Sequence, residues 1–326
     1  MAISKIRTEN REEWLAERRN SLGGSDMGAV LGMSPFASPI SVWMDKTGRK
    51  PAEEENEWMR WGADLEGYVA QRFTEKSGLK LINDTATWKN DKYPYLHANI
   101  DRKVVGRKEG VECKLVATLG EKKYRNGKFP DNYYCQCVTY LAISEYDRWY
   151  LAVLIHGIGI RIYQLTRIPN DTVPTWCESS VYVDDAEIEA LVKTGEAFWK
   201  NYVEKDTPPP ADGHSATAEA LATLYPESNA ETVNLFGYEN ELSQYIALTV
   251  QIKALEGQKD EIANKVKAFL GNAGRGENER YKVSWTSTER KSLDTKRLVA
   301  EHPEINLNDY YKISASRTFR VNEKGE

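Results

Sequence analysis

Apolar positions recur along the chain with two spacings, and each spacing predicts one kind of element. From Glu57 to Ser77 they return every three or four residues, which predicts an amphipathic helix that Gly78 ends. Its apolar stripe comprises Trp58, Trp61, Leu65, Tyr68, Val69 and Phe73. Shorter stretches of the same period predict helices over 11–19, 25–32, 39–47, 130–143 and 184–204, with Ser25 as the N-cap of the second.

Runs of β-branched and aromatic residues predict the strands. They lie at about 79–88, 95–105, 110–116, 148–157 and 159–167, and Gly157 supplies the turn between the last two. Together the elements of residues 1–204 predict one catalytic domain of the α+β class with an α/β-type three-layer core. Its centre is a mixed sheet with helices packed against it.

A different organisation follows. Residues 205–217 contain three consecutive prolines and predict a linker, because proline fits neither a helix interior nor a central strand. The C-terminal extension, 218–326, begins with a coiled-coil-like helix over about 238–270. A small strand, helix and strand follow at 281–287, 294–305 and 314–321. The long helix serves either self-assembly or packing on its own C-terminal segment.

Composition narrows the chemistry. No apolar run approaches the roughly 18 residues of a membrane span, and the N-terminus lacks the apolar region of a secretion signal, so we expect a cytoplasmic protein without membrane contacts. The four cysteines show no CxxC spacing and the four histidines no HxH or HxxxH pair. A bound metal would therefore be held by carboxylates, which favour Mg²⁺ or Mn²⁺. The net charge is −5, yet 101–128 holds nine Lys or Arg against four Asp or Glu, a local patch that can attract a polyanion.

One stretch, HANIDRKVVGRKEGVECKLV, carries the candidate chemistry. If the chain reverses at Gly106 and Arg107, Asp101 stands opposite Glu112, and Glu112 and Lys114 share a face because side chains alternate along a strand. Two opposed carboxylates repel, and a divalent cation between them removes the repulsion. The alternative is that Lys114 simply neutralises them as an ion pair.

Two further residues favour a metal site. Glu66 lies at the edge of the 57–77 stripe, partly turned toward the sheet, although an edge glutamate can also extend into water. Gln136 lies on a mostly apolar helix and either orients Lys114 or a water, or is a satisfied core residue. Glu66, Asp101, Glu112 and the backbone carbonyl of Cys113 would hold one or two ions. Lys114 would position or deprotonate the attacking water, or stabilise the charged transition state.

Five segments in order also resemble the YqaJ-type viral recombinases, relatives of the phage lambda exonuclease. They are RRNSLGGSDMGAVLGMSPF, MRWGADLEGYVAQRF, HANIDRKV, VECKLV and YYCQCVTYLAIS, within residues 18–144. The resemblance implies a restriction-endonuclease-like core with a D…ExK site. It implies that Glu66, Asp101 and Glu112 bind the metal and that Lys114 is the catalytic lysine.

The same resemblance assigns DNA contacts. Arg18 and Ser25 match positions that bind a terminal 5′-phosphate. Asn99 stands where the family has serine, and Lys122 or Lys123 would replace an arginine that follows the ExK motif. Val138 departs from the usual Gln-x-Gln of the helix that carries Gln136.

The function implied is a metal-dependent exonuclease. It would digest one strand of linear duplex DNA 5′→3′ and leave 3′ overhangs for a phage single-strand annealing protein, as a homo-oligomeric ring, a trimer in most relatives. Two alternatives remain: an endonuclease or RecB/Cas4-like end-processing nuclease on the same core, and a non-catalytic DNA-end-binding scaffold.

Overall fold

Two units make up the chain. The computed structural model describes residues 2–51, 56–312 and 317–324. The first unit covers Met1–Tyr225 and the second Pro226–Glu326. The first unit extends beyond the expected limit at residue 204. Helix α7 (Ser215–Leu224), which starts inside the expected linker, buries Ala216 and Ala220 and contacts α3 (Pro39–Lys46).

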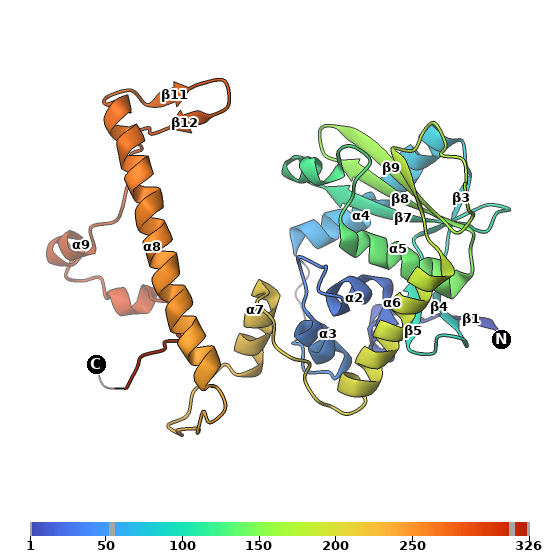
Figure 1. The fold of residues 1–326 in the computed structure, drawn as a ribbon, viewed down its shortest axis with the longest axis horizontal. Helices are drawn as coiled ribbons and strands as arrows, with labels where there is room; N and C mark the ends of the chain where they lie inside the picture. The colour runs from blue at the N-terminus through green and yellow to red at the C-terminus, as the bar shows by residue number, and fades with distance from the viewer. Residues whose placement is uncertain (1, 52–55, 313–316, 325–326) are drawn as a thin grey trace. The chain divides into compact units, whose positions relative to one another are not determined.

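A six-stranded mixed sheet forms the centre of the first unit (Figure 1). Its order is β10-β9-β8-β7-β6-β3, and β7 is parallel to β8 but antiparallel to β6. This confirms the predicted mixed sheet. The strands are β3 (Leu81–Asn83), β6 (Arg102–Val104), β7 (Glu109–Val116), β8 (Arg148–Ile155), β9 (Gly159–Thr166) and β10 (Ser179–Tyr182).

A second, four-stranded sheet was not expected. Its order is β1-β4-β5-β2, formed by β1 (Ile3–Ile6), β4 (Thr87–Asn90), β5 (Leu96–Asn99) and β2 (Leu22–Gly23). The predicted strands 79–88 and 95–105 are each divided between the two sheets. The chain leaves β5 and enters β6 through Ile100 and Asp101, so Asp101 lies at the junction.

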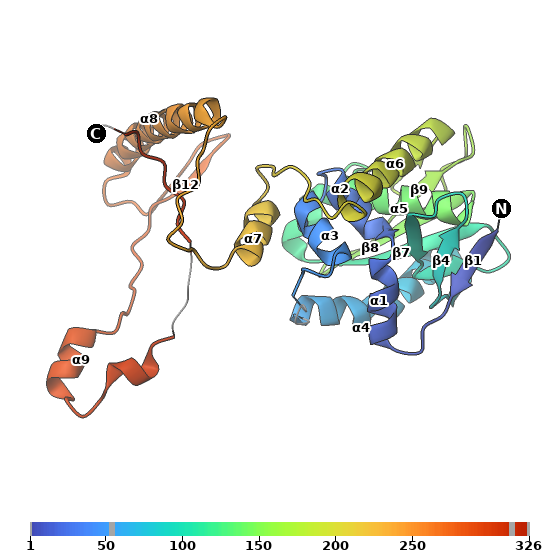
Figure 2. The same cartoon turned by 90° about the horizontal axis from the view of Figure 1, so that it is seen from below.

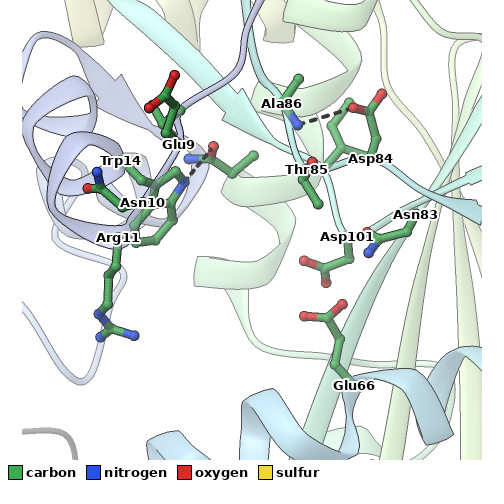
Figure 3. A pocket seen from close by; sticks show the side chains of 13 residues that line it. Glu9, Asn10, Arg11, Trp14, Glu66, Asn83, Asp84, Thr85, Ala86 and Asp101 are labelled. Carbon is green, nitrogen blue, oxygen red and sulfur yellow. Dashed lines mark hydrogen bonds between the residues drawn. The ribbon is translucent and has the colours of Figure 1, made fainter.

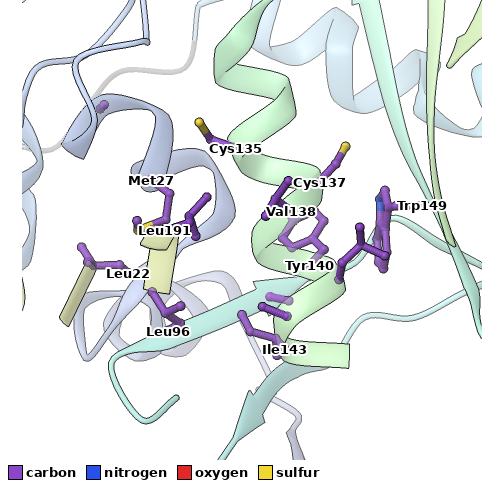
Figure 4. Close-up of a cluster of buried hydrophobic side chains, with 14 of the residues drawn as sticks. Leu22, Met27, Leu96, Cys135, Cys137, Val138, Tyr140, Ile143, Trp149 and Leu191 are labelled. Atoms are coloured by element: carbon purple, nitrogen blue, oxygen red, sulfur yellow. The ribbon is translucent and has the colours of Figure 1, made fainter. Parts of the chain in front are cut away.

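Helices cover both faces of the six-stranded sheet. On one face, Val69 and Phe73 of α4 (Glu57–Ser77) pack with Tyr150 and Ile162. On the other face, α5 (Asp131–Ser144) packs with α2 (Gly24–Val30) and α6 (Asp185–Phe198) around the main core (Figures 2 and 4). Helix α1 (Arg11–Arg19) and a π-helical turn after α6 (Trp199–Val203) complete the predicted set.

Two details of the helices differ from the expectation. Helix α2 begins at Gly24 with Gly23 as its N-cap, so Ser25 lies in the first turn instead of capping it. The cap is supplied by Asp26, whose carboxylate accepts the Gly23 N–H at 2.8 Å. In α4 only the last two members of the apolar stripe, Val69 and Phe73, are buried; the first four, Trp58, Trp61, Leu65 and Tyr68, are exposed.

The hairpin of β6 and β7 has the predicted register. Arg102 pairs with Val111 and Lys103 with Gly110, so one further step sets Asp101 opposite Glu112. Gly106 has φ +72°, the left-handed conformation that the turn requires of it.

The second unit contains one long helix, α8 (Glu239–Leu270), close to the predicted bounds. A short hairpin of β11 (Arg275–Glu277) and β12 (Lys282–Ser284), helix α9 (Thr295–Glu301) and a 3₁₀ turn (Leu307–Tyr310) follow. Of the last predicted strand, 314–316 lie outside the described residues, and 317–321 do not form a strand. Among the residues described, no helix is both long and apolar enough to cross a membrane.

Candidate active site

Glu112 is the most constrained acid of the candidate site. It lies on β7 beneath α5 and is 2% exposed. Its Oε1 accepts hydrogen bonds from Gln136 Nε2 at 2.6 Å and pairs with Lys114 Nζ at 2.5 Å. Its Oε2 is buried and has no hydrogen-bond partner in the structure. A buried carboxylate oxygen without a partner is costly, so this atom is available to a cation.

In the structure Gln136 contacts an acid of the candidate site, Glu112. Its Nε2 contacts both Glu112 Oε1 and the hydroxyl of Tyr140, at 2.9 Å. Because Tyr140 lies four residues further along α5, the helix itself fixes the amide. Its amide therefore links the carboxylate of Glu112 on the sheet to Tyr140 on α5.

The carboxylate of Asp101 takes the place of a backbone hydrogen-bond acceptor on the strand next to β7. Its Oδ2 accepts the backbone N–H of Cys113 at 2.8 Å. In an extended strand the N–H and C=O of one residue point to the same side, so the Cys113 carbonyl also lies on the side of Asp101. Burial raises the pKa of Asp101 well above its usual range, and the charge of Glu112 adds to it; Glu66 adds less and Lys114 opposes. The charges of Glu66, Glu112 and Lys114 thus all influence the protonation of Asp101.

Glu66 reaches the site from the other face of the sheet. It is half-buried on α4 and forms an ion pair with Arg102, the residue that follows Asp101. The carboxylates of Glu66 and Asp101 point toward one another (Figure 3). Sequence reasoning missed Arg102, although its place directly after Asp101 is a signal: in a strand, that spacing sends its side chain to the opposite face, where α4 lies.

The cations already present compensate much of this negative charge. Burial alone would lower the pKa of Lys114, but Glu112 and Asp101 raise it above its ordinary value, so Lys114 carries its charge at neutral pH. Its ammonium group also lies 5.2 Å from the ring of Tyr133. In the described parts of the chain, no three His, Cys, Asp or Glu side chains are already gathered as a metal cluster.

The donor set nevertheless suits a hard divalent cation. It offers three groups: the unpartnered carboxylate oxygen of Glu112, the carboxylate of Asp101 and the carbonyl of Cys113. Burial, and then the charge of Glu112, raise the pKa of Asp101, and a bound cation would offset both effects. Glu66 would have to exchange Arg102 for the ion. Oxygen ligands without histidine or thiolate match magnesium or manganese.

Two cavities meet beside these residues. The first, of about 520 Å³, is lined by Glu66, Asp101 and Asn99 together with residues of α1 and of the segment before it (Figure 3). The second, of about 420 Å³, is lined by Arg18, Arg19 and other residues of α1 and α3. Arg11 and Trp14 line both, so the carboxylates and a basic recess are neighbours along α1.

Arg18 is held in place within this basic recess. Its guanidinium lies 4.7 Å from the ring of Trp14 and 3.5 Å from Ser25 Oγ, and its carbonyl accepts from Lys46 Nζ at 2.9 Å. Lys46 is fully buried and pairs with Asp26 at 2.7 Å. Burial would raise the pKa of Asp26, but the charges of Lys46 and Arg18 lower it to about 2.

The other predicted DNA contacts are placed differently. Asn99 lines the first cavity, but its Oδ1 already accepts from Thr87 Oγ1 at 2.8 Å and from Trp14 Nε1 at 3.3 Å. Lys122 and Lys123 are exposed on a 3₁₀ turn (Thr118–Tyr124) after β7, and neither lines the two cavities.

The chain is similar to known proteins over most of its length. A family model described as the YqaJ-like viral recombinase domain matches residues 13–147. A Bacillus subtilis (strain 168) protein described as "Uncharacterized protein YqaJ" is 32% identical over 323 residues, which is 98% of this chain and 95% of that protein.

Solved structures with low sequence identity are also similar. An alkaline exonuclease from Laribacter hongkongensis matches with 18% identity and a TM-score of 0.47, over 66% of this chain and all of that one. A phage-related exonuclease from Haemophilus somnus 129PT matches with 13% identity and a TM-score of 0.40, over 57% of this chain and 96% of that one.

Proposed function

Because the chain belongs to the family of YqaJ-like viral recombinases, we propose that it is a metal-dependent deoxyribonuclease that degrades linear duplex DNA from its ends. The observation that carries the proposal is the state of Glu112. One of its oxygens is held by Lys114 and Gln136, and the other is buried without a partner beside Asp101. Most buried carboxylate oxygens in proteins have a hydrogen-bond partner, so an open oxygen beside a second acid supports a cation site.

Glu66, Asp101, Glu112 and the carbonyl of Cys113 are the groups that would hold one or two Mg²⁺ or Mn²⁺ ions. Bound there, such an ion acidifies a coordinated water and offsets the negative charge that develops on the phosphate. Gln136 keeps the carboxylate of Glu112 in one orientation, and Asp101 is kept in place by the Cys113 amide. Lys114 is close enough to Glu112 to position the attacking water or to stabilise the charged transition state.

DNA contacts would extend from these acids along α1. Arg18 would offer its guanidinium, and Ser25 in the first turn of α2 its hydroxyl, to a terminal 5′-phosphate. Asn99 would add its amide group at the wall of the first cavity. Lys122 and Lys123 would bind the DNA backbone further from the reacting bond, since both are exposed cations.

The finer features of the proposal come from the family resemblance. They are 5′→3′ polarity, 3′ overhangs that serve a single-strand annealing protein, and a ring of copies, three in number, around the DNA. The two alternative functions, an endonuclease and a non-catalytic end binder, share the same fold and differ in what they do to closed DNA.

A single digestion separates the three possibilities. Linear 5′-phosphorylated duplex and covalently closed circular DNA are incubated with the protein and Mg²⁺, and both are followed on a gel. We expect loss of the linear DNA alone. Loss of both would identify an endonuclease, and loss of neither would leave the end-binding function. Duplexes labelled at the 5′ or 3′ end then report the polarity.

Variants on one strand test the residues. Glu112→Gln and Lys114→Met should each lower the rate on linear DNA at least about 1,000-fold, because they remove a metal ligand and the neighbouring cation. The matched control is Glu109→Gln: Glu109 is a buried glutamate of the same strand, but it pairs with Arg148 at 2.9 Å and lies outside the site. It should cost stability and leave the rate per folded molecule within a few fold. Equal losses in all three would refute the assignment.

Metal binding can be measured without DNA. At an ion concentration 100 times its Kd, binding to the folded state adds about 2.7 kcal/mol to the free energy of unfolding. For a unit of this size that raises Tm by roughly 5–11 °C. We expect this shift with Mg²⁺ or Mn²⁺ after chelation of the wild-type protein, and no shift for Glu112→Gln. If the Tm of the wild-type protein is the same with and without each ion, the proposed metal site is wrong.

A further inference from the structure

Helix α8 of the second unit is long and has no buried residue. It runs for 32 residues, about 48 Å at 1.5 Å per residue. Its leucine, isoleucine and phenylalanine side chains are largely exposed, for example Leu255 at 62% and Phe269 at 91%. A helix in a protein is stabilised mainly by packing of its apolar face, so we expect another element to pack against the apolar face of α8.

The spacing of the apolar residues indicates which kind of element packs against this face. From Tyr245 to Phe269 they follow an alternating three- and four-residue step that only Lys259 interrupts. The first positions of the repeat are Tyr245, Ile252, Lys259 and Val266, and the fourth positions are Leu248, Leu255, Ile262 and Phe269. A repeat of 3.5 residues keeps its stripe facing a neighbour only when two helices wind around each other. A sheet or a loop does not require it.

The described residues of the second unit offer no such helix. Its other helices, α9 with seven residues and the 3₁₀ turn with four, are too short to follow four heptads. Phe319 covers one end of the stripe, because its ring meets that of Tyr245 edge-on at 5.5 Å. From Leu248 onward the stripe remains open. A second copy of the chain supplies a helix of equal length and the same repeat.

We propose that α8 pairs with α8 of a second copy in a parallel, two-stranded coiled coil. At the first position Ile252 and Val266 are β-branched, and two of the four residues at the fourth position, Leu248 and Leu255, are leucine; β-branched residues at the first position with leucine at the fourth favour two parallel strands. A single polar residue at a first position, here Lys259, fixes register and strand number and weakens the pair. Of the ion pair of Glu261 and Lys265, Glu261 lies on the outer face of the repeat and Lys265 flanks the seam.

Mass measurements on the full chain test the pairing. Val250 lies on the outer face of the repeat and is 63% exposed, against 62% for Leu255 in the seam, so the two positions differ in their place in the repeat and not in accessibility. Leu255→Glu should raise the dissociation constant on the order of 100-fold, because a charge would enter the seam unpaired. In light scattering it should halve the mass of the assembly, and Val250→Glu should leave the mass unchanged.

This outcome does not depend on what the first unit does. If the first units form no contacts, the wild-type protein has twice the chain mass of 37.1 kDa and Leu255→Glu has the single mass. If they form a ring, the seam joins two rings and its loss again halves the mass. An equal mass for wild type and Leu255→Glu, or an equal change in both variants, would overturn the proposal, whether or not the protein cleaves DNA.

Cross-linking tests the orientation. Leu248 lies near the start of the helix, so in a fully overlapping antiparallel pair the two copies of residue 248 would be about 20 Å apart. In the parallel pair they are opposed. Leu248→Cys should give a covalent dimer under mild oxidation, and Val250→Cys and the wild-type chain should not. A Leu248→Cys protein that pairs by mass but forms no dimer would refute the parallel arrangement.

Discussion

Replacement of Gln136 by methionine tests how far the site depends on a residue whose amide bonds to Glu112 and Tyr140. Gln136→Met keeps the length of the side chain and removes its donors to Glu112 Oε1, at 2.6 Å, and to the Tyr140 hydroxyl, at 2.9 Å. The bond to the carboxylate is charge-assisted and buried. Such bonds contribute about 1.5–3 kcal/mol, or roughly a 10- to 150-fold change in an equilibrium constant.

The expected result is a change in metal dependence. Without Gln136 the carboxylate of Glu112 is held by Lys114 alone and can rotate. The Mg²⁺ concentration for half-maximal cleavage should therefore rise about 10- to 100-fold, the usual cost of losing a residue that orients a ligand. The KM for DNA should stay the same, because Gln136 is buried. Cleavage rates measured against Mg²⁺ and then against DNA separate the two effects.

Thr139→Val is the matched control. Thr139 is buried on the same helix, and its hydroxyl donates to the Cys135 carbonyl at 2.7 Å without reaching the site. Both variants should lower the Tm, and only Gln136→Met should move the Mg²⁺ midpoint. An unchanged midpoint in a destabilised Gln136→Met protein would show that the glutamine is a core residue and that the orientation argument is wrong.

Three further predictions concern the packing and protonation of the residues around the site. Burial, followed by the charge of Lys46, lowers the pKa of His97 from 6.5 to about 3. Below pH 6.5 the unfolded chain therefore binds a proton at His97 that the folded chain does not bind, so the free energy of unfolding decreases as the pH is lowered. Urea titrations should show a loss of about 2 kcal/mol by pH 5, and His97→Gln should not show this loss. An added Cβ at Gly24 would lie 2.6 Å from the ring of Tyr140, so Gly24→Ala should lower the free energy of unfolding by about 1–3 kcal/mol and reduce cleavage. Gly62→Ala, with nothing within 4 Å, should instead stabilise helix α4 by about 0.5–1 kcal/mol in the same unfolding assay, and the opposite order would contradict the packing.

The sequence predicts those parts of the fold that depend on local patterns. The period of α4, the bounds of α1 and the hairpin register around Gly106 follow from residue spacing and turn chemistry, and the structure confirms them. The same register correctly sets Asp101 opposite Glu112. These features are local because neighbours along the chain or across one turn decide them.

The remaining features depend on distant partners. No local pattern reveals that the 95–105 segment divides between two sheets, because this follows from the pairing of β5 with β4 and of β6 with β7. The exposure of Trp58 and Trp61 cannot be predicted from the sequence either. An apolar stripe shows which face of a helix is apolar, but not how far the sheet beneath it extends. Gln136 illustrates both limits: its helix was predictable, but its partner Glu112 lies 24 positions away.

The interruption between β5 and β6 has a consequence for protein engineering. Asp101 accepts a hydrogen bond from the Cys113 amide because β6 begins only at Arg102, so that no strand residue pairs with this amide. In a continuous sheet the amide would already be paired, and the same carboxylate would point elsewhere. Grafting Asp101, Glu112 and Lys114 onto a regular designed sheet would therefore copy the side chains without their arrangement. The break in the strand has to be transplanted with them.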